Sequence, residues 1–196
     1  EKKIAERSEK ERKTGKKPKG SAPKPPTPGP TGKDQVNLTD SESRIMPSGS
    51  GFEQAYNAQA TVDTASMLIV ADCISQNPND KQELKPALDR IDALPGELGA
   101  VDALIADSGY FSEANVASCE AKQVTPYIAP GREGHNQPLM ERFVEPPPVP
   151  DDADCVARMK YRLKTAAGKA IYAKRKGTVE PVFGIIKAVM GFRSFL

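Results

Sequence analysis

The chain has 196 residues, of which 38% are hydrophobic, and its formal net charge at pH 7 is +2. This length and apolar content are enough for one sizeable hydrophobic core. The absence of an apolar run of about 18 residues argues against a membrane span, and the three scattered cysteines argue against a disulfide framework or a thiolate zinc site.

The small net charge hides a strong segregation of charge along the chain. Residues 1–33 carry a net charge of +7, residues 34–155 carry −14, and residues 156–196 carry +9. Clustered Lys and Arg favour a polyanionic partner, because binding to phosphates releases condensed counterions. Nucleic acid is the leading candidate. The alternative is a solvated basic tail followed by an ordinary lysine-rich helix.

Residues 1–33 pass from a charged stretch, itself a candidate helix, into a Pro/Gly/Lys-rich one with almost no apolar side chains. Such a composition cannot bury enough surface to offset the entropy of ordering the chain. We therefore predict a disordered basic linker over 1–33 and one domain over 34–196. Within the domain, the first regular elements expected are two β-prone segments, YNAQATVD and MLIVADCIS, joined by a polar turn at 63–66 into a hairpin.

A helix and a β-α-β unit are predicted next. Asn79 can cap a helix whose Leu84, Leu88 and Ile91 recur at helical spacing. The short apolar run at 103–106 predicts a strand that ends at Asp107, followed by a helix over 113–122 and a strand over 124–129. The two strands should be parallel.

The last third of the domain is predicted to be a loop followed by helices. Residues 130–155 are rich in Pro and turn formers, which indicates a loop or insertion. Residues 156–196 return to a helical pattern with an apolar face of Val179, Phe183, Ile186 and Met190. The whole pattern predicts the α/β fold class.

Two acidic residues lie where they can carry chemistry. Asp107 is predicted at the carboxyl end of a buried parallel strand, the edge at which open α/β sheets bind ligands. Its alternative role is to open an Asp-Ser-Gly turn. Glu180 is the only acid in residues 156–196 and stands among bases, although it can equally pair with Lys176 one helical turn away. Two carboxylates of this kind can hold the divalent cations that phosphodiester chemistry uses.

Five segments carry a family resemblance: NLTDSESRIM, FEQAYNAQATVD, NPNDKQEL, ADSGYFSEAN and YAKRKGTVEPVFGIIKAVMGFRSFL. Together, over roughly residues 35–196, they resemble bacterial insertion-sequence transposases with an Asp-Asp-Glu catalytic domain. The resemblance implies a ribonuclease-H-like mixed sheet flanked by helices. It also implies hydrolysis of DNA at transposon ends with Mg²⁺ or Mn²⁺, followed by attack of the freed 3′-hydroxyl on target DNA.

Carried over to this chain, the resemblance makes Asp107 the second metal-binding catalytic acid and Glu180 the third. Lys187, Arg175, Lys176 and Tyr172 are then expected to bind DNA. Many relatives place six residues between the glutamate and the lysine, as here, but three between the arginine and the glutamate. In this chain four residues separate Arg175 from Glu180, which puts the roles of Tyr172 and Arg175 in doubt.

The first acid of such a triad belongs to a strand that precedes the hairpin, and no strand is predicted there. Asp40 lacks a flanking apolar run, and Asp63 falls in the hairpin turn. We therefore expect a partial copy of the domain that lacks its first strand and first aspartate, with little or no catalysis alone.

The resemblance further implies DNA as the partner, a possible homo-oligomer, a bacterial cytoplasmic, nucleoid-associated location, and neither a membrane nor a small-molecule substrate. The main alternative function is a non-catalytic DNA-binding remnant. A third is an interaction domain whose acidic middle binds proteins. His135, the single histidine, is expected in a surface loop without a hydrolase-type triad.

Overall fold

The computed structural model describes residues 2–25, 29, 36–48, 51–131, 144–150 and 152–192. The chain divides into two compact units, Glu1–Ser41 and Glu42–Leu196. The predicted loop at 130–155 lies only partly within the described ranges, and His135 lies outside them. None of the described helices is long and apolar enough to cross a membrane.

The first unit contains the helix α1 (Lys2–Thr14), inside the segment predicted to be a linker. Its sequence consists mainly of strong helix formers, and Glu9 and Lys13 form an i,i+4 ion pair at 2.7 Å. Arg7 donates to the carbonyl oxygens of Pro18 (2.6 Å) and Gly20 (2.8 Å), so the chain after the helix folds back along it. Local helix propensity, rather than a hydrophobic core, thus forms this helix in the charged stretch that precedes the Pro/Gly/Lys-rich segment.

The second unit begins with a hairpin that the sequence analysis missed. Strands β1 (Arg44–Ser48) and β2 (Gly51–Ala55) pair antiparallel, with Pro47 opposite Phe52. The prediction that no strand precedes residue 53 is therefore wrong. These strands bury little apolar surface, and Phe52 is exposed, so the hairpin has no hydrophobic pattern that a sequence could display. Neither strand contains an aspartate.

The predicted hairpin is confirmed as β3 (Asn57–Val62) paired antiparallel with β4 (Ile69–Ser75). Asp63 shapes its turn, because its Oδ2 accepts hydrogen bonds from the backbone nitrogen (2.7 Å) and hydroxyl (2.6 Å) of Ser66. These bonds hold the pKa of the Asp63 carboxyl below its ordinary value. The Asp63 carboxylate therefore has a structural role in the turn of the hairpin.

The helix and the β-α-β unit are also confirmed. Asn79 caps the short 3₁₀ turn η1 (Asp80–Gln82), which leads into α2 (Leu84–Asp92) with Pro86 in its first turn. The 3₁₀ turn η2 (Gly96–Leu98) follows. Strand β5 (Ala103–Ala106), the turn η3 (Ser108–Tyr110), helix α3 (Glu113–Ala121) and strand β6 (Thr125–Ile128) then follow, and β5 and β6 pair in parallel.

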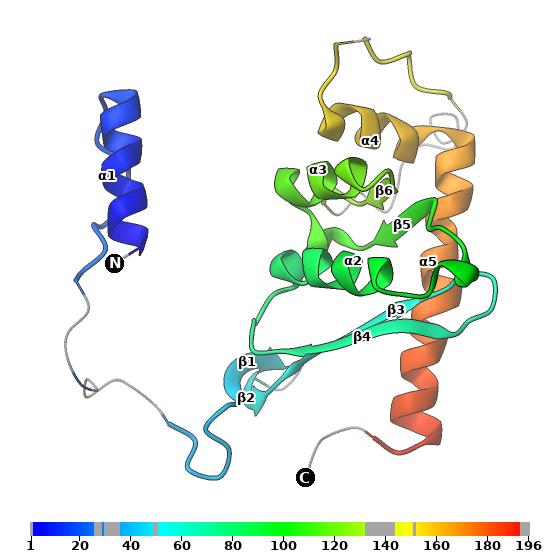
Figure 1. Cartoon of the computed structure of the whole chain (residues 1–196), viewed down its shortest axis with the longest axis horizontal. Coiled ribbons are helices and arrows are strands. Elements are labelled where there is room, and N and C mark those ends of the chain that lie inside the picture. Colours follow the sequence, from blue (N-terminus) through cyan, green and yellow to red (C-terminus); the bar gives the residue numbers. More distant parts are fainter. Residues whose placement is uncertain are drawn as a thin grey trace. The chain divides into compact units, whose positions relative to one another are not determined.

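Two helices and a π-helical turn end the described chain. They are α4 (Cys155–Lys164), α5 (Ala166–Gly184) and η5 (Ile185–Val189). Helix α5 contacts β3, β5 and β6, so this one helix joins the β3–β4 pair to the β5–β6 pair (Figure 1). Helix α2 packs against β4 and α3, and α3 packs against β6 and α4.

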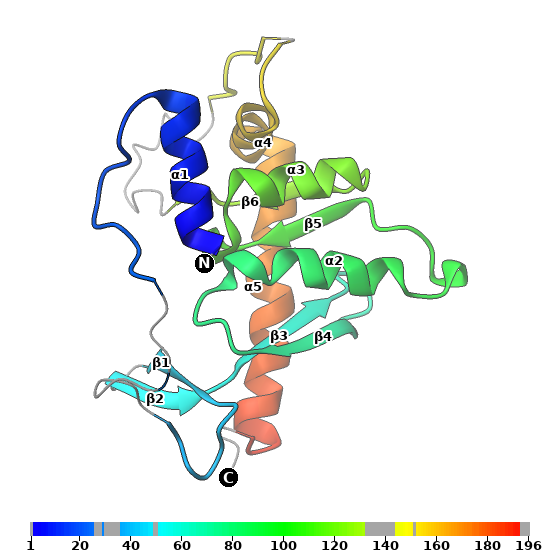
Figure 2. The same cartoon turned by 60° about the vertical axis from the view of Figure 1, so that its left-hand side comes forward.

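The strands form three separate two-stranded sheets, β1–β2, β3–β4 and β5–β6. The prediction of α/β architecture with antiparallel and parallel pairing is confirmed, but a single continuous mixed sheet is not formed by the described residues. In Figure 2, α2 lies in front of the strands and α5 behind them. The helices, rather than a shared hydrogen-bonded ladder, therefore hold β3–β4 and β5–β6 in one unit.

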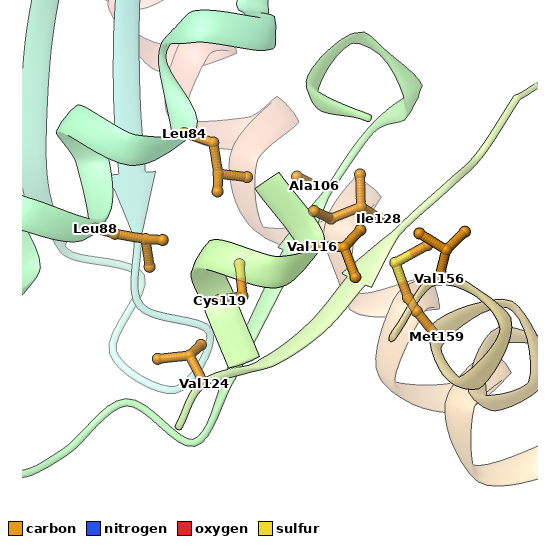
Figure 3. Packing of buried hydrophobic residues seen from close by; sticks show 9 residues of the cluster. All are labelled: Leu84, Leu88, Ala106, Val116, Cys119, Val124, Ile128, Val156 and Met159. Carbon is orange, nitrogen blue, oxygen red and sulfur yellow. The ribbon is translucent and has the colours of Figure 1, made fainter. Parts of the chain in front are cut away.

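The core lies where α2, α3, α4, β5 and β6 meet (Figure 3). Its buried members are Leu84, Leu88, Ala106, Val116, Cys119, Val124, Ile128, Val156 and Met159. The apolar face predicted for the last helix is less buried than expected. Val179, Phe183 and Ile186 are half-buried, whereas Met190 is 57% exposed, because the C-terminal end of this helical segment extends past the strands (Figure 2).

Candidate functional site

Asp107 occupies the turn that follows strand β5, whose last residue, Ala106, is buried. Its backbone is extended, and its Oδ1 accepts a hydrogen bond from the backbone nitrogen of Gly109 at 2.8 Å. The side chain is partly buried. Asp107 thus opens the Asp-Ser-Gly turn, as its alternative role predicts, but this uses only one of its two carboxylate oxygens. The second oxygen, Oδ2, makes no hydrogen bond within the described chain and remains available to a ligand.

A second carboxylate lies beside Asp107. A Cβ atom placed on Gly109 would lie 3.0 Å from Asp107 Oδ1 and 3.0 Å from Asp80 Oδ2, so the two oxygens are no more than twice that distance apart. Gly109 is therefore the residue that allows the two carboxylates to approach. Asp80 was not among the predicted site residues, although the NPNDKQEL segment that contains it carries part of the family resemblance.

Amide side chains from β3 hold the Asp80 carboxylate. Asp80 Oδ1 accepts hydrogen bonds from Asn57 Nδ2 (2.9 Å) and Gln59 Nε2 (2.8 Å). Gln59 Oε1 in turn accepts a hydrogen bond from the hydroxyl of Tyr110, which closes the turn after Asp107. Burial of the Tyr110 phenol, with the nearby charges of Asp80, Asp107 and Glu83, raises its pKa above its ordinary value. Tyr110 therefore stays protonated and acts as a donor.

The same region is tied together by a buried asparagine. Asn115 is 6% exposed, and its Nδ2 donates to the carbonyl oxygens of Lys81 (2.9 Å) and Tyr110 (2.7 Å). These bonds connect η1, which begins at Asp80, with η3, which follows Asp107. Two turns far apart in the sequence are thereby joined through one side chain of α3.

Glu180 is exposed on α5, the helix that contacts β5. It forms no ion pair with Lys176 among the residues that the structure describes. Pro181 follows it directly, inside the helix, and has no backbone N–H to donate toward Gly177. The π-helical turn η5 comes soon after, and such turns are frequent at functional sites. Helix α5, which carries Glu180, thus contacts the strand that ends directly before Asp107, and no interaction joins the two side chains in the described chain.

The predicted DNA-binding residues lie along α5 and η5. Lys176 and Lys187 are exposed, and the Lys187 ammonium lies 5.6 Å from the centre of the Phe183 ring. The Arg175 guanidinium lies 5.8 Å from the centre of the Tyr172 ring, and Arg175 Nε is buried without a hydrogen-bond partner in the described chain. Tyr172 and Arg175 therefore form a stacked pair on α5, eight and five residues before Glu180.

The oxygen donors of Asp107 and Asp80 suit a hard divalent cation such as Mg²⁺ in their chemistry. They do not make a complete ligand set. Over the described ranges, no three His, Cys, Asp or Glu side chains gather closely enough to hold a metal ion. Glu180, the third acid of the triad that the resemblance implies, lies outside the Asp80–Asp107 pair.

Comparison with known proteins identifies the family. The chain matches the transposase DDE domain over residues 22–196. No curated protein and no solved structure gave a significant match. Because the match covers most of the chain, the protein belongs to the transposase DDE domain family, whose function is DNA transposition.

Proposed function

We propose that this member of the transposase DDE domain family hydrolyses phosphodiester bonds at transposon ends and joins the freed 3′-hydroxyl to target DNA, with Asp107 and Glu180 as metal-binding catalytic acids. The observation that carries the proposal is the position of Asp107. Asp107 directly follows a parallel strand, the backbone nitrogen of Gly109 fixes one oxygen of its carboxylate, and the other oxygen makes no hydrogen bond in the described chain.

Bound Mg²⁺ or Mn²⁺ would supply Lewis-acid activation of the attacking and leaving oxygens. The role of the protein residues is to orient donors and to bind the polyanion. Asp107 presents Oδ2 from a turn held by Asn115 and Tyr110. Glu180 presents its carboxylate from α5, and the proline after it keeps the helix from continuing regularly.

Basic side chains of α5 and η5 are proposed to bind the DNA backbone. Lys169, Lys174, Lys176 and Lys187 are all exposed, so phosphate groups can reach them. Arg158 and Arg162 of α4 instead pair with Glu120 at 2.6 Å and 3.3 Å. The proposal extends to a homo-oligomer assembled on two DNA ends.

The metal role predicts that Asp107→Asn and Glu180→Gln each weaken Mn²⁺ binding. Loss of one carboxylate ligand should raise the Kd for Mn²⁺ about 10-fold or more, because a neutral amide oxygen is a poorer donor to a divalent cation. Electron paramagnetic resonance titration of free Mn²⁺ measures this. Asp63→Asn is the matched control, since the Asp63 carboxylate is hydrogen-bonded to Ser66 within the turn between β3 and β4. Equal Kd values for all four proteins would overturn the assignment.

DNA binding by α5 predicts a weaker salt dependence for Lys176→Ala. Removing one phosphate contact should reduce the slope of log K against log salt concentration by about 1, and it should do so equally for different DNA sequences. Fluorescence anisotropy at several salt concentrations measures the slope. Lys122→Ala is the control, because Lys122 is held by Asp89 and Asp92. If the salt-dependence slope of Lys176→Ala equals that of the wild type, Lys176 does not contact a DNA phosphate.

A non-catalytic DNA-binding remnant is the second candidate function. The lack of a three-ligand acidic group over the described ranges favours it. It predicts salt-sensitive DNA binding by the wild-type chain, with no Mn²⁺-dependent nicking of a supercoiled plasmid and no effect of Asp107→Asn on DNA affinity. Nicking that requires Mn²⁺ and disappears in Asp107→Asn would exclude it.

A further inference from the structure

A side-chain hydrogen bond joins Gln59 of β3 to Tyr110 in the turn after β5, and it is not part of the backbone hydrogen bonding of either sheet. Gln59 lies on β3, which pairs only with β4 among the described strands, and Tyr110 lies in η3. The Gln59 side chain crosses from one two-stranded sheet to the other. It uses both ends of its amide, since Oε1 accepts from Tyr110 and Nε2 donates to Asp80 Oδ1.

These bonds form a closed loop around the turn that carries Asp107. From Asp107 the backbone passes through Gly109 to Tyr110, the Tyr110 hydroxyl reaches Gln59, and Gln59 reaches Asp80. Asp80 Oδ2 then packs against Gly109, next to Asp107 Oδ1. Gln59 and Asp80 thus restrict the turn from two sides without any direct bond to Asp107.

We propose that Gln59 and Asp80 are positioning residues that hold the Asp107 carboxylate in its binding orientation. The inference rests on the proposed function in one respect, that Asp107 binds a metal. Its geometric part stands apart from that, because the backbone amide of Gly109 reports directly on Asp107 Oδ1, the atom that accepts its hydrogen bond.

Two variants test the loop from its two sides. Gln59→Ala removes both bonds of the amide, and Tyr110→Phe removes only the hydroxyl while the ring stays in place. Hydrogen exchange of the Gly109 amide, followed by NMR, should become about 10-fold faster in each, because Asp107 Oδ1 is no longer held over it. If both residues act through one loop, the double variant should exchange no faster than Gln59→Ala.

Two controls separate positioning from general destabilisation. The Val116 amide, which donates to Ser112 O in α3, should keep its exchange rate in both variants. Gln54→Ala removes a glutamine of β2 that contacts Ser43, and it should leave the Gly109 amide unaffected. Tyr110→Phe retains the aromatic packing and keeps the test valid if Gln59→Ala does not fold.

The Kd for Mn²⁺ supplies the second readout. Residues that orient a ligand through hydrogen bonds contribute about 10-fold to metal affinity, so Gln59→Ala and Asp80→Asn should each raise the Kd by that factor. Faster Gly109 exchange together with weaker Mn²⁺ binding supports the proposal. Faster Gly109 exchange in a protein without measurable Mn²⁺ binding supports the positioning of Asp107 and contradicts the metal function. Unchanged Gly109 exchange, or equal acceleration of Gly109 and Val116, overturns it.

Discussion

Replacing Met159 with alanine is expected to lower the free energy of unfolding by about 2–5 kcal/mol. Met159 is fully buried on α4, and it joins Val116 of α3 and Ile128 of β6 in the core (Figure 3). Removing its side chain leaves a cavity where three elements meet, and the rigid strand β6 cannot collapse to fill it. Urea denaturation followed by circular dichroism measures the change.

The adjacent residue is the matched control for this prediction. Lys160 is exposed on the same helix, so Lys160→Ala should change the free energy of unfolding by no more than about 0.5 kcal/mol. A loss below about 1 kcal/mol for Met159→Ala would show that α4 is not part of the cooperative core. The slope of the unfolding transition should be the same in all three proteins.

Gly168→Ala is expected to destabilise the protein by about 1–3 kcal/mol through overpacking. Gly168 is buried in the first turn of α5, and an added Cβ would collide with the carbonyl oxygen of Arg162 in the last turn of α4. That obstacle is backbone, and it also accepts the hydrogen bond of the Thr165 hydroxyl, so it cannot rotate away. The substitution must open the α4–α5 junction.

Gly177 offers a control of opposite sign in the same helix. A Cβ at Gly177 would meet nothing within 4 Å, so Gly177→Ala should stabilise the protein by up to about 1 kcal/mol through helix propensity. Thermal unfolding by calorimetry measures both variants. A melting temperature of Gly168→Ala equal to that of the wild type would show that the junction is looser than the structure places it.

Much of the local structure was predictable from particular residues. Asn79, Leu84 and Leu88 predicted a capped helix and its buried face, and the run ending at Asp107 predicted β5 and its turn. The hairpin β1–β2 was missed because backbone hydrogen bonds hold it together, and its residues show no alternating apolar pattern. The charged stretch at the start of the chain was a candidate helix by composition, and α1 forms there.

The candidate site was predictable only in part. Asp107 was found because a strand end followed by Asp-Ser-Gly is a local pattern. Asp80 and Gln59 were not found, because each looks ordinary in its own segment. Glu180, Tyr172, Arg175, Lys176 and Lys187 were located on a helix as predicted, and their roles in metal and DNA binding stay predictions for the experiments above.

The amino-acid sequence alone determined the family, the segregation of charge and most of the helices and strands, because periodicity, capping and motif spacing act over a few neighbouring residues. Only the tertiary structure decided that Asp80 faces Asp107 across Gly109, that Gln59 reaches Tyr110, and that Met159 completes the core. Those contacts join residues distant in the chain. They depend on how α5 and α2 hold separate pairs of strands together, and no local pattern encodes that packing.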